Sequence, residues 1–281
     1  MSAEKNGLVV KSNRLIEASY RLSRVEQLLI LQAIVQCREE QCGLTATKPV
    51  TIVAAEFAAR FGLEPGSVYG QMKEALNGLY TRDVRIHDIH PKSGKPRVVN
   101  TRWISDKAYI DGEGIVELTF TPKVVPFITR LEKEFTSYRL EKVGKMTGAH
   151  AIRLYELLLQ YLAAGQREIE LENLKEMLGI PGEYKAIKDL KKRVVDPALK
   201  QIKEHTDIDV SYENVKRGRT VTGFIFTIKA KSDPEIEQPK KVRKKTVIND
   251  AYIKKHARPG ESSDQVMRRL LEESGQQRLS D

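Results

Sequence analysis

The sequence has few cysteines and aromatic residues, and it contains no long apolar run. Cys37 and Cys42 are too few to staple a chain of 281 residues with disulfides, so a reducing compartment such as the cytoplasm is expected. No stretch approaches the ~20 apolar residues that cross a bilayer. The N-terminal segment also lacks the apolar core of a secretory signal. The sequence therefore predicts a protein that does not span a membrane.

The common motifs of catalysis are missing as well. Gly144-Lys145 lacks the earlier glycine and the following Ser or Thr of a phosphate loop, and no Gly-x-Gly-x-x-Gly occurs. His87 and His90 would face opposite sides of an expected strand, with no third metal ligand evident, and the His-hydrophobic-His pattern of nicking nucleases is absent. We therefore expect no catalytic residue, no metal and no cofactor, against the alternatives of an ATPase or a nicking enzyme.

Basic residues are in excess. Lys and Arg number 48 against 38 Asp and Glu, which gives a formal net charge of +10. A polyanionic partner suits this balance, because each phosphate that a cation neutralises releases condensed counterions. Charge alone leaves open a merely soluble basic protein, but it favours nucleic-acid binding.

Apolar spacing and turn residues predict one arrangement of helices and strands twice along the chain. In the first half, Ser23 precedes Glu26 by three residues, the capping pair that starts a helix at about residue 24. The second expected helix covers 53–61 and should end at Gly62. Ser67 should cap a third, which should bury Val68, Met72, Ala75, Leu76 and Leu79. The expected strands of the first half are 84–89, 97–105 and 115–121. Those of the second half are helices at 148–162, 171–178 and 183–204 and strands at 208–214 and 221–228.

A short helix, a glycine turn, a longer helix and a hairpin form a winged helix, so the predicted fold is α+β with two tandem winged helices. The repeat is clearest where Phe57, Phe61, Gly62 and Leu63 have the same spacing as Leu174, Leu178, Gly179 and Ile180. The predicted domains are residues 1–144, for dimerisation and auxiliary DNA contacts, and 145–231, for the main DNA recognition. Residues 232–281 are predicted to form a mobile basic tail.

Leucines at positions 8, 15, 22 and 29 recur every seven residues, which leaves two interpretations open. They could form a short zipper for dimerisation, or they could pack in the core. The expected helix start after Ser23 interrupts the heptads and favours the core.

The helix expected over 183–204 is the strongest candidate for recognising DNA. Seven Lys or Arg lie between residues 185 and 203 against two Asp, a net charge of +5. Helical spacing gathers Ala186, Ile187, Leu190 and Val194 on one side, opposite the lysines. Asp196-Pro197 predicts a bend that leaves the N-terminal half free for the major groove, where Lys or Arg can bond guanine. The predicted recognition residues are Lys185, Lys188, Lys191, Lys192 and Arg193. A solvated basic face is the alternative.

Basic hairpin tips should add phosphate contacts. The predicted second wing carries Lys216, Arg217 and Arg219. Lys92, Lys95 and Arg97 are expected to occupy the same place in the first half. The long helix of the first half offers Tyr69, Gln71 and Lys73, a weaker set. That half is therefore expected to touch mainly the DNA backbone, or to serve as a dimer surface.

Four segments together resemble one known family. They are VKSNRLIEASYRL at 10–22, FTSYRL at 135–140, IRLYELL at 152–158 and RVVDPA at 193–198. In this order they are similar to the replication initiators of iteron-carrying bacterial plasmids, and the resemblance covers about residues 8–230. The tail segment AYIKKHARPGES at 251–262 resembles extensions found in some members.

The resemblance implies two winged helices related by a pseudo-twofold axis, the second of which makes the main base contacts, with Arg193 at a family arginine. It implies monomers on direct repeats at the origin, and dimers that bind an inverted repeat and repress the initiator's own gene. The implied partners are double-stranded DNA, a second copy of the chain, the host replication initiator, the replicative helicase and chaperones. A transcriptional repressor remains the alternative, since it would share every feature except initiation.

Overall fold

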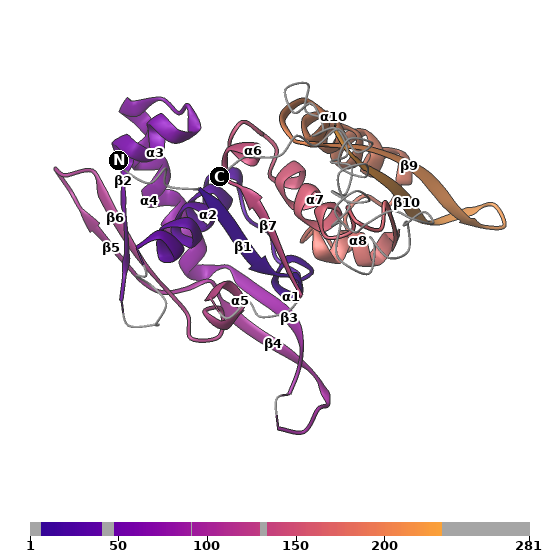
Figure 1. Ribbon diagram of the computed structural model, residues 1–281, viewed down its shortest axis with the longest axis horizontal. Coiled ribbons are helices and arrows are strands. Elements are labelled where there is room, and N and C mark those ends of the chain that lie inside the picture. The colour runs from indigo at the N-terminus through magenta and orange to yellow at the C-terminus, as the bar shows by residue number, and fades with distance from the viewer. Residues whose placement is uncertain (1–6, 41–47, 91, 130–133, 232–281) are drawn as a thin grey trace, which may run out of the picture. The chain divides into compact units, whose positions relative to one another are not determined.

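The computed structural model contains two copies of one arrangement of helices and strands (Figure 1). It describes residues 7–40, 48–90, 92–129 and 134–231, which all lie in one compact unit. Each copy has a three-stranded antiparallel sheet in which the last strand lies between the other two. With the helix-turn-helix before it, this strand order makes two winged helices, as the sequence predicts. The predicted basic tail and Cys42 lie outside the described residues.

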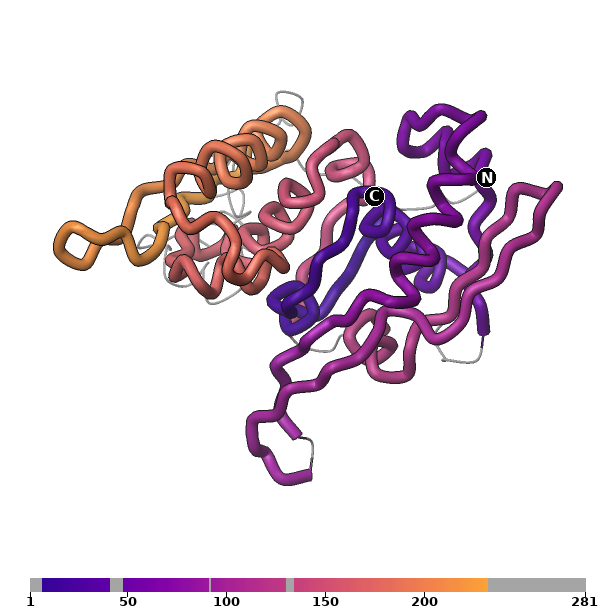
Figure 2. Tube along the Cα trace, turned by 180° about the vertical axis from the view of Figure 1, so that it is seen from behind, coloured from indigo at the N-terminus to yellow at the C-terminus, as the bar shows by residue number. Residues whose placement is uncertain are grey.

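The two halves, which Figure 2 shows from behind, follow each other along the chain. The first half consists of β1 (Leu8–Ser12), α1 (Asn13–Ile16), α2 (Arg24–Glu39), β2 (Val50–Val53), α3 (Ala54–Phe61), α4 (Pro65–Thr81), β3 (Asp83–Ile89), β4 (Pro96–Arg102), β5 (Ile104–Ile110), β6 (Ile115–Phe120), α5 (Pro126–Thr129), β7 (Phe135–Arg139) and α6 (Glu141–Gly144). The second half consists of α7 (Ala149–Leu159), β8 (Gln166–Glu170), α8 (Leu171–Met177), α9 (Ile187–Leu190), the π-helical η1 (Lys191–Val195), α10 (Asp196–His205), β9 (Ile208–Arg217) and β10 (Thr220–Ala230).

Several strands were not predicted. β1 pairs with β7, and β8 forms one edge of the second sheet. β3 and β4 form a separate hairpin, inserted between α4 and β5. The sequence pattern predicted one strand over 97–105, but Trp103 separates β4 from β5 there, and its side chain is fully buried.

Helix α2 begins where the sequence predicts. The Ser23 side chain accepts a hydrogen bond from the Glu26 backbone N–H, and the Glu26 carboxylate accepts one from the Ser23 backbone. The four leucines at heptad spacing do not share one helix, so the zipper interpretation is wrong. Leu15, Leu22 and Leu29 are instead buried in the core.

Gly62 and Gly179 end α3 and α8 with the same turn. Both have positive φ, 59° and 70°. The next residues, Leu63 and Ile180, donate their backbone N–H to the carbonyl five residues earlier, at 3.0 and 2.9 Å. The short sequence repeat is therefore confirmed as a structural repeat.

Helix α4 begins before its predicted cap. Pro65 occupies the first turn, where its missing N–H loses no helical bond. Ser67 lies inside that turn and bonds Glu64 and Gln71 within the helix. The prediction that Ser67 is the cap is therefore wrong. The buried side of α4 holds Val68, Met72, Ala75, Leu76 and Leu79, as predicted.

The helix predicted over 183–204 is shorter and has three parts. Gly182 and Tyr184 have positive φ, 74° and 52°, so the chain enters α9 only after them. α9 then widens into η1, where the Asp196 backbone N–H donates to Lys191 O, five residues back. α10 follows with Pro197 in its first turn. At the place of the predicted bend the chain has a π-helical segment, and Pro197 follows in the first turn of α10, where proline is tolerated.

A cluster of buried polar side chains lies where the two halves meet. Glu156 of α7 accepts hydrogen bonds from Lys11 (2.9 and 3.0 Å), Tyr138 (2.6 Å) and Arg153 (3.1 Å). Burial acts to raise the pKa of Glu156, but the charges of Lys11 and Arg153 and the Tyr138 hydroxyl outweigh it and keep that pKa below its ordinary value. The carboxylate is therefore ionised inside the protein.

Arg153 joins the halves through their backbones. It donates to the carbonyl oxygens of Ile16 (2.7 Å) and Ala18 (3.1 Å) in the first half and of Met177 (3.0 Å) in the second. Its guanidinium lies 3.8 Å from the centre of the Tyr20 ring. More exposed ion pairs between the halves are Arg167–Glu17, Arg85–Glu176 and Arg21–Glu183.

Replacing Glu156 with Gln should lower the free energy of unfolding by about 3–5 kcal/mol, because Lys11 and Arg153 would stay buried without a counter-charge. Urea unfolding measures this loss. Glu168→Gln, at an exposed position of β8, is the matched control and should change stability by less than about 0.5 kcal/mol. Equal losses in the two variants would contradict the role assigned to the cluster.

Gly179→Ala should destabilise the protein more than Gly62→Ala, although both turns need positive φ. A methyl group at 62 meets nothing within 4 Å, so only backbone strain of about 1–2 kcal/mol is added. A methyl group at 179 would overlap the Tyr20 carbonyl and the Arg21 side chain, so the halves must also separate. Denaturant titration of both variants measures the difference, and indistinguishable stabilities would count against it.

Candidate nucleic-acid interface

The second winged helix places basic side chains on the surface of α9 and η1. Lys188, Lys192 and Arg193 are exposed, whereas Leu190 and Val194 between them are buried. At these positions the chain has the basic outer side and apolar inner side that helical spacing predicts. The three cations are therefore free to meet a ligand.

Lys185 and Ala186 lie in the loop before α9. Both residues are exposed. The prediction that Ala186 joins the buried side is wrong, because helical spacing does not apply where the chain is not yet helical. Ile187 is half-buried and begins the apolar side. Lys185 remains a predicted DNA contact, but from a loop.

Lys191 differs from its neighbours because two aromatic rings hold it. Its Nζ lies 5.3 Å from the ring centre of Tyr212 and 5.5 Å from that of Phe224. Tyr212 donates its hydroxyl to Asp196 at 2.7 Å, and burial together with this bond raises the pKa of the tyrosine. These contacts attach η1 to β9 and β10, the strands that carry the second wing.

The second wing projects away from the helices of its own half (Figures 1 and 2). Gly218, with φ of 63°, and Arg219 form the turn between β9 and β10. The sequence predicted that β9 ends at residue 214 and that Lys216 and Arg217 lie in a loop. They are instead the last two residues of β9. All three basic side chains are exposed.

Six exposed cations on α9, η1 and the second wing have no ion-pair partner among the described residues. We call them the basic face, and they are Lys188, Lys192, Arg193, Lys216, Arg217 and Arg219. By contrast, Lys200 and Lys203 on α10 lie 4.0 Å from Glu204 and 3.7 Å from Asp209. Cations without a partner can take phosphate oxygens without first breaking a protein contact.

The first wing is not where the sequence pattern predicts it. The second wing joins β9 to β10, and the strands with the same places in the first sheet are β5 and β6. Residues 111–114 connect them and read Asp-Gly-Glu-Gly, without a basic residue. The prediction that Lys92, Lys95 and Arg97 hold the equivalent place is therefore wrong, because they belong to the inserted β3–β4 hairpin.

The three cations of the β3–β4 hairpin differ in whether they have an ion-pair partner. Lys92 and Lys95 are exposed near its tip. Arg97 donates to Asp88 at 2.6 and 3.1 Å, and Arg14 donates to the same carboxylate at 2.6 Å. Burial acts to raise the pKa of Asp88, but the hydrogen bonds from Arg97, the Ile89 backbone and Arg14 outweigh it and lower that pKa. Arg97 is therefore already paired with a carboxylate, which it shares with Arg14.

Helix α4, the second helix of the first helix-turn-helix, is bonded to the first wing. Asp111 accepts hydrogen bonds from Tyr69 at 2.8 Å and from Lys73 at 3.0 Å. The Lys73 Nζ lies 5.4 Å from the ring centre of Tyr69 and 5.1 Å from that of Tyr109. The hydrogen bond to Lys73 lowers the pKa of Asp111 and raises that of Lys73. Gln71 bonds within the helix. Two of the three predicted contacts on α4 are thus paired with a carboxylate.

Sequence reasoning did not single out Asp111, Tyr109, Tyr212 or Phe224. A signal for Asp111 was present, since Asp-Gly-Glu-Gly before an expected strand marks a hairpin turn. Its meaning depends on which strands pair, which the local pattern does not state. The two rings beneath Lys191 come from strands that only the fold brings to η1.

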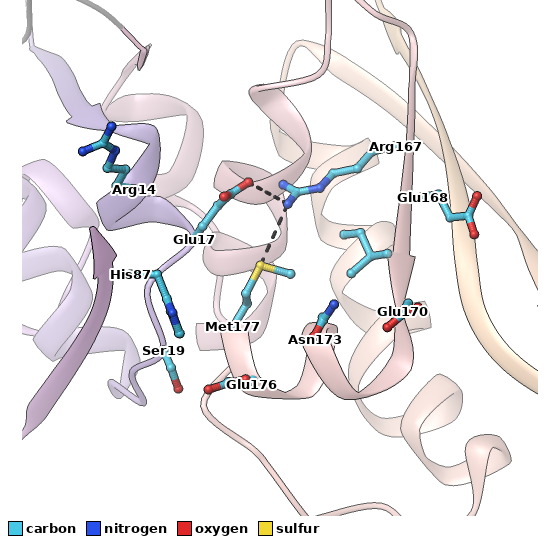
Figure 3. Close-up of a pocket in the computed structure, with 11 residues that line it drawn as sticks. Arg14, Glu17, Ser19, His87, Arg167, Glu168, Glu170, Asn173, Glu176 and Met177 are labelled. Carbon is cyan, nitrogen blue, oxygen red and sulfur yellow. Dashed lines mark hydrogen bonds and ion pairs between the residues drawn. The ribbon is translucent and has the colours of Figure 1, made fainter. Parts of the chain in front are cut away.

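A groove of about 580 Å³ lies between the halves, and its charge disfavours a nucleic-acid site (Figure 3). Its charged lining residues are Glu17, Glu168, Glu170, Glu176, Arg14 and Arg167. Arg167 already reaches Glu17, as the figure shows. Four carboxylates against two guanidinium groups would repel a phosphate.

Neither a metal centre nor a membrane segment is found in the described part of the chain. His87 lines the groove, but no three metal-binding side chains come together among the residues described. No helix there combines the length and the apolar character that crossing a bilayer requires.

Comparisons with known proteins find similar chains. Residues 8–159 match a family model described as "Initiator Replication protein, WH1", and residues 170–228 match "Initiator Rep protein, WH2". An uncharacterized 27.6 kDa protein of Escherichia coli is 29% identical over 235 residues, which are 80% of this chain and 95% of that one. A replication initiation protein of Escherichia coli is 26% identical over 227 residues, 79% of this chain and 69% of that one.

A solved structure is similar in fold. It is described as the crystal structure of Pi initiator protein in complex with iteron DNA. The similarity covers 82% of this chain and 100% of that one, with a TM-score of 0.64 and 20% sequence identity.

Proposed function

The chain belongs to the replication initiator family, and on that basis we propose that it binds repeated double-stranded sites at a plasmid origin and initiates replication there. The observation that carries the proposal is the basic face, whose six cations have no ion-pair partner in the described part of the chain. The structural neighbour described with iteron DNA supports the same class of ligand.

In this proposal the second winged helix, residues 145–231, reads the DNA sequence. Lys188, Lys192 and Arg193 enter the major groove, where lysine and arginine bond guanine O6 and N7. The second wing grips phosphates and adds affinity that depends little on sequence. The contacts of Lys191 with the Tyr212 and Phe224 rings fix the position of η1 relative to the second wing, so that both engage a single DNA site.

The first winged helix, residues 1–144, has an auxiliary role and carries the dimer surface. Its acidic first wing, and the pairing of Arg97 with Asp88, support a weaker contact with DNA. Lys92 and Lys95 add phosphate contacts from the inserted hairpin. Monomers occupy the direct repeats, and dimers bind an inverted repeat and repress the gene of the protein itself.

Initiation follows from binding and recruitment, without an active site in this chain. The family consists of DNA-binding winged-helix proteins rather than of enzymes. The partners are the host replication initiator, the replicative helicase and chaperones, in the cytoplasm of a bacterial host.

A plasmid that carries the gene and its origin as the only replicon tests this function. The wild-type gene should support replication, and a double variant, Lys188→Ala with Lys192→Ala, should not. Operator binding without replication would instead identify a transcriptional repressor.

Lys188→Ala or Lys192→Ala should each weaken binding to the cognate site by about 1–3 kcal/mol and relax specificity at one base pair. Lys216→Ala should weaken binding to every sequence alike and reduce the salt slope by about one. Selection of bound fragments from random DNA identifies the cognate site, and anisotropy titrations over a salt series then measure both effects.

The matched control is Lys200→Ala, which removes an exposed cation within 4.0 Å of Glu204 and outside the basic face. It should change affinity little. If all three test variants lose equal affinity for cognate and random DNA, the helix does not read bases.

A further inference from the structure

The two wings carry opposite charge although they hold the same place in their sheets. The second wing has Lys216, Arg217 and Arg219, whereas residues 111–114 contain two carboxylates and no cation. A basic wing adds to the attraction between the protein and a phosphate backbone, and an acidic wing subtracts from it. The first wing also bonds α4 through Asp111, whereas residues 216–219 of the second wing contain no carboxylate.

The bonds of Asp111 are those that a DNA phosphate would make. One carboxylate oxygen of Asp111 accepts two hydrogen bonds. The Lys73 ammonium donates one at 3.0 Å, and the Tyr69 hydroxyl donates the other at 2.8 Å. Lysine and tyrosine are common donors to phosphate oxygens in protein–DNA complexes. Tyr109 and Tyr69 also hold the Lys73 ammonium over their rings, so its position does not depend on the carboxylate alone.

The pair is open to solvent. The side chain of Asp111 is 73% exposed and that of Lys73 is 35% exposed. Exposed ion pairs are weak, so an arriving phosphate can compete with the carboxylate. Asp111 would therefore weaken a contact between Lys73 and a DNA phosphate without preventing it.

We propose that Asp111 is a built-in substitute for a DNA phosphate, which occupies Lys73 and Tyr69 and thereby weakens DNA binding by the first winged helix. The inference rests on the proposed function, since it concerns the strength of DNA binding. The basic face of the second half has no such group. DNA therefore meets the second winged helix first, and the first engages once the duplex is held nearby at high effective concentration.

Asp111→Asn tests the proposal, because the amide keeps the shape and one acceptor oxygen while it removes the charge. The full chain is titrated with a fluorescein-labelled random duplex of about 30 base pairs over a salt series. The variant should bind about 3–10-fold more tightly at low salt, with a salt slope steeper by about 0.9, because Lys73 now neutralises one more phosphate. Lys73→Gln in the same chain should remove the gain.

The matched control is Asp106→Asn. Asp106 is exposed, lies on β5 and bonds Ser105, but it has no ion-pair partner among the residues described. A gain with Asp106→Asn equal to that with Asp111→Asn would overturn the proposal, and so would a gain that persists after Lys73→Gln.

The same titrations separate this inference from the function on which it rests. If the wild-type chain binds in a manner that depends on Lys192, but Asp111→Asn leaves affinity and slope unchanged, only the role of Asp111 fails. If neither chain binds the random duplex nor any fragment selected from random DNA, the proposed function fails with it.

Discussion

The relation between the two winged helices depends on one buried charge, the carboxylate of Glu156. An ionised group inside a protein destabilises the fold unless its charge and lone pairs are matched. Here the matching donors are Lys11 on β1, Tyr138 on β7 and Arg153 on α7, so the match exists only when both halves are in place. The exposed ion pairs around the cluster contribute much less. Three of the four segments that resemble initiators, 10–22, 135–140 and 152–158, thus meet at this interior site. The residues that these segments contribute to the cluster are buried.

Much of the fold could be predicted because its signals are local. The cap at Ser23 and the turns at Gly62 and Gly179 depend on residues within one helical turn of each other, and each was found where expected. Two winged helices follow from repeating such signals. Helix starts were less certain, because Pro65 and the positive φ of Tyr184 shifted them by a few residues. The two hairpin pairings, β3 with β4 and β9 with β10, were predicted. The pairing of β1 with β7 and of β2 with β6 was not, since it joins segments far apart in the chain.

The candidate site shows the same division. The exposure of Lys188 and Lys192 follows from helical spacing, so the sequence was sufficient for them. The aromatic support beneath Lys191, the pairing of Arg97 and the place of the first wing all depend on non-local contacts. Basic residues in a hairpin therefore say little by themselves about a wing. The strand order decides which turn lies beside the recognition helix, and here it selects an acidic turn in one half and a basic turn in the other.

The carbonyl oxygens that Arg153 binds have a consequence for how such a chain can evolve. Two belong to residues 16 and 18 and one to residue 177, so a single guanidinium is shared between segments of both winged helices. A crossover that brought in one winged helix from a distant homologue would have to bring in, or already match, the groups around that guanidinium and Glu156. Recombination between the two halves is therefore constrained by a few interior atoms. The pair, and not the single winged helix, is the unit that can be inherited intact.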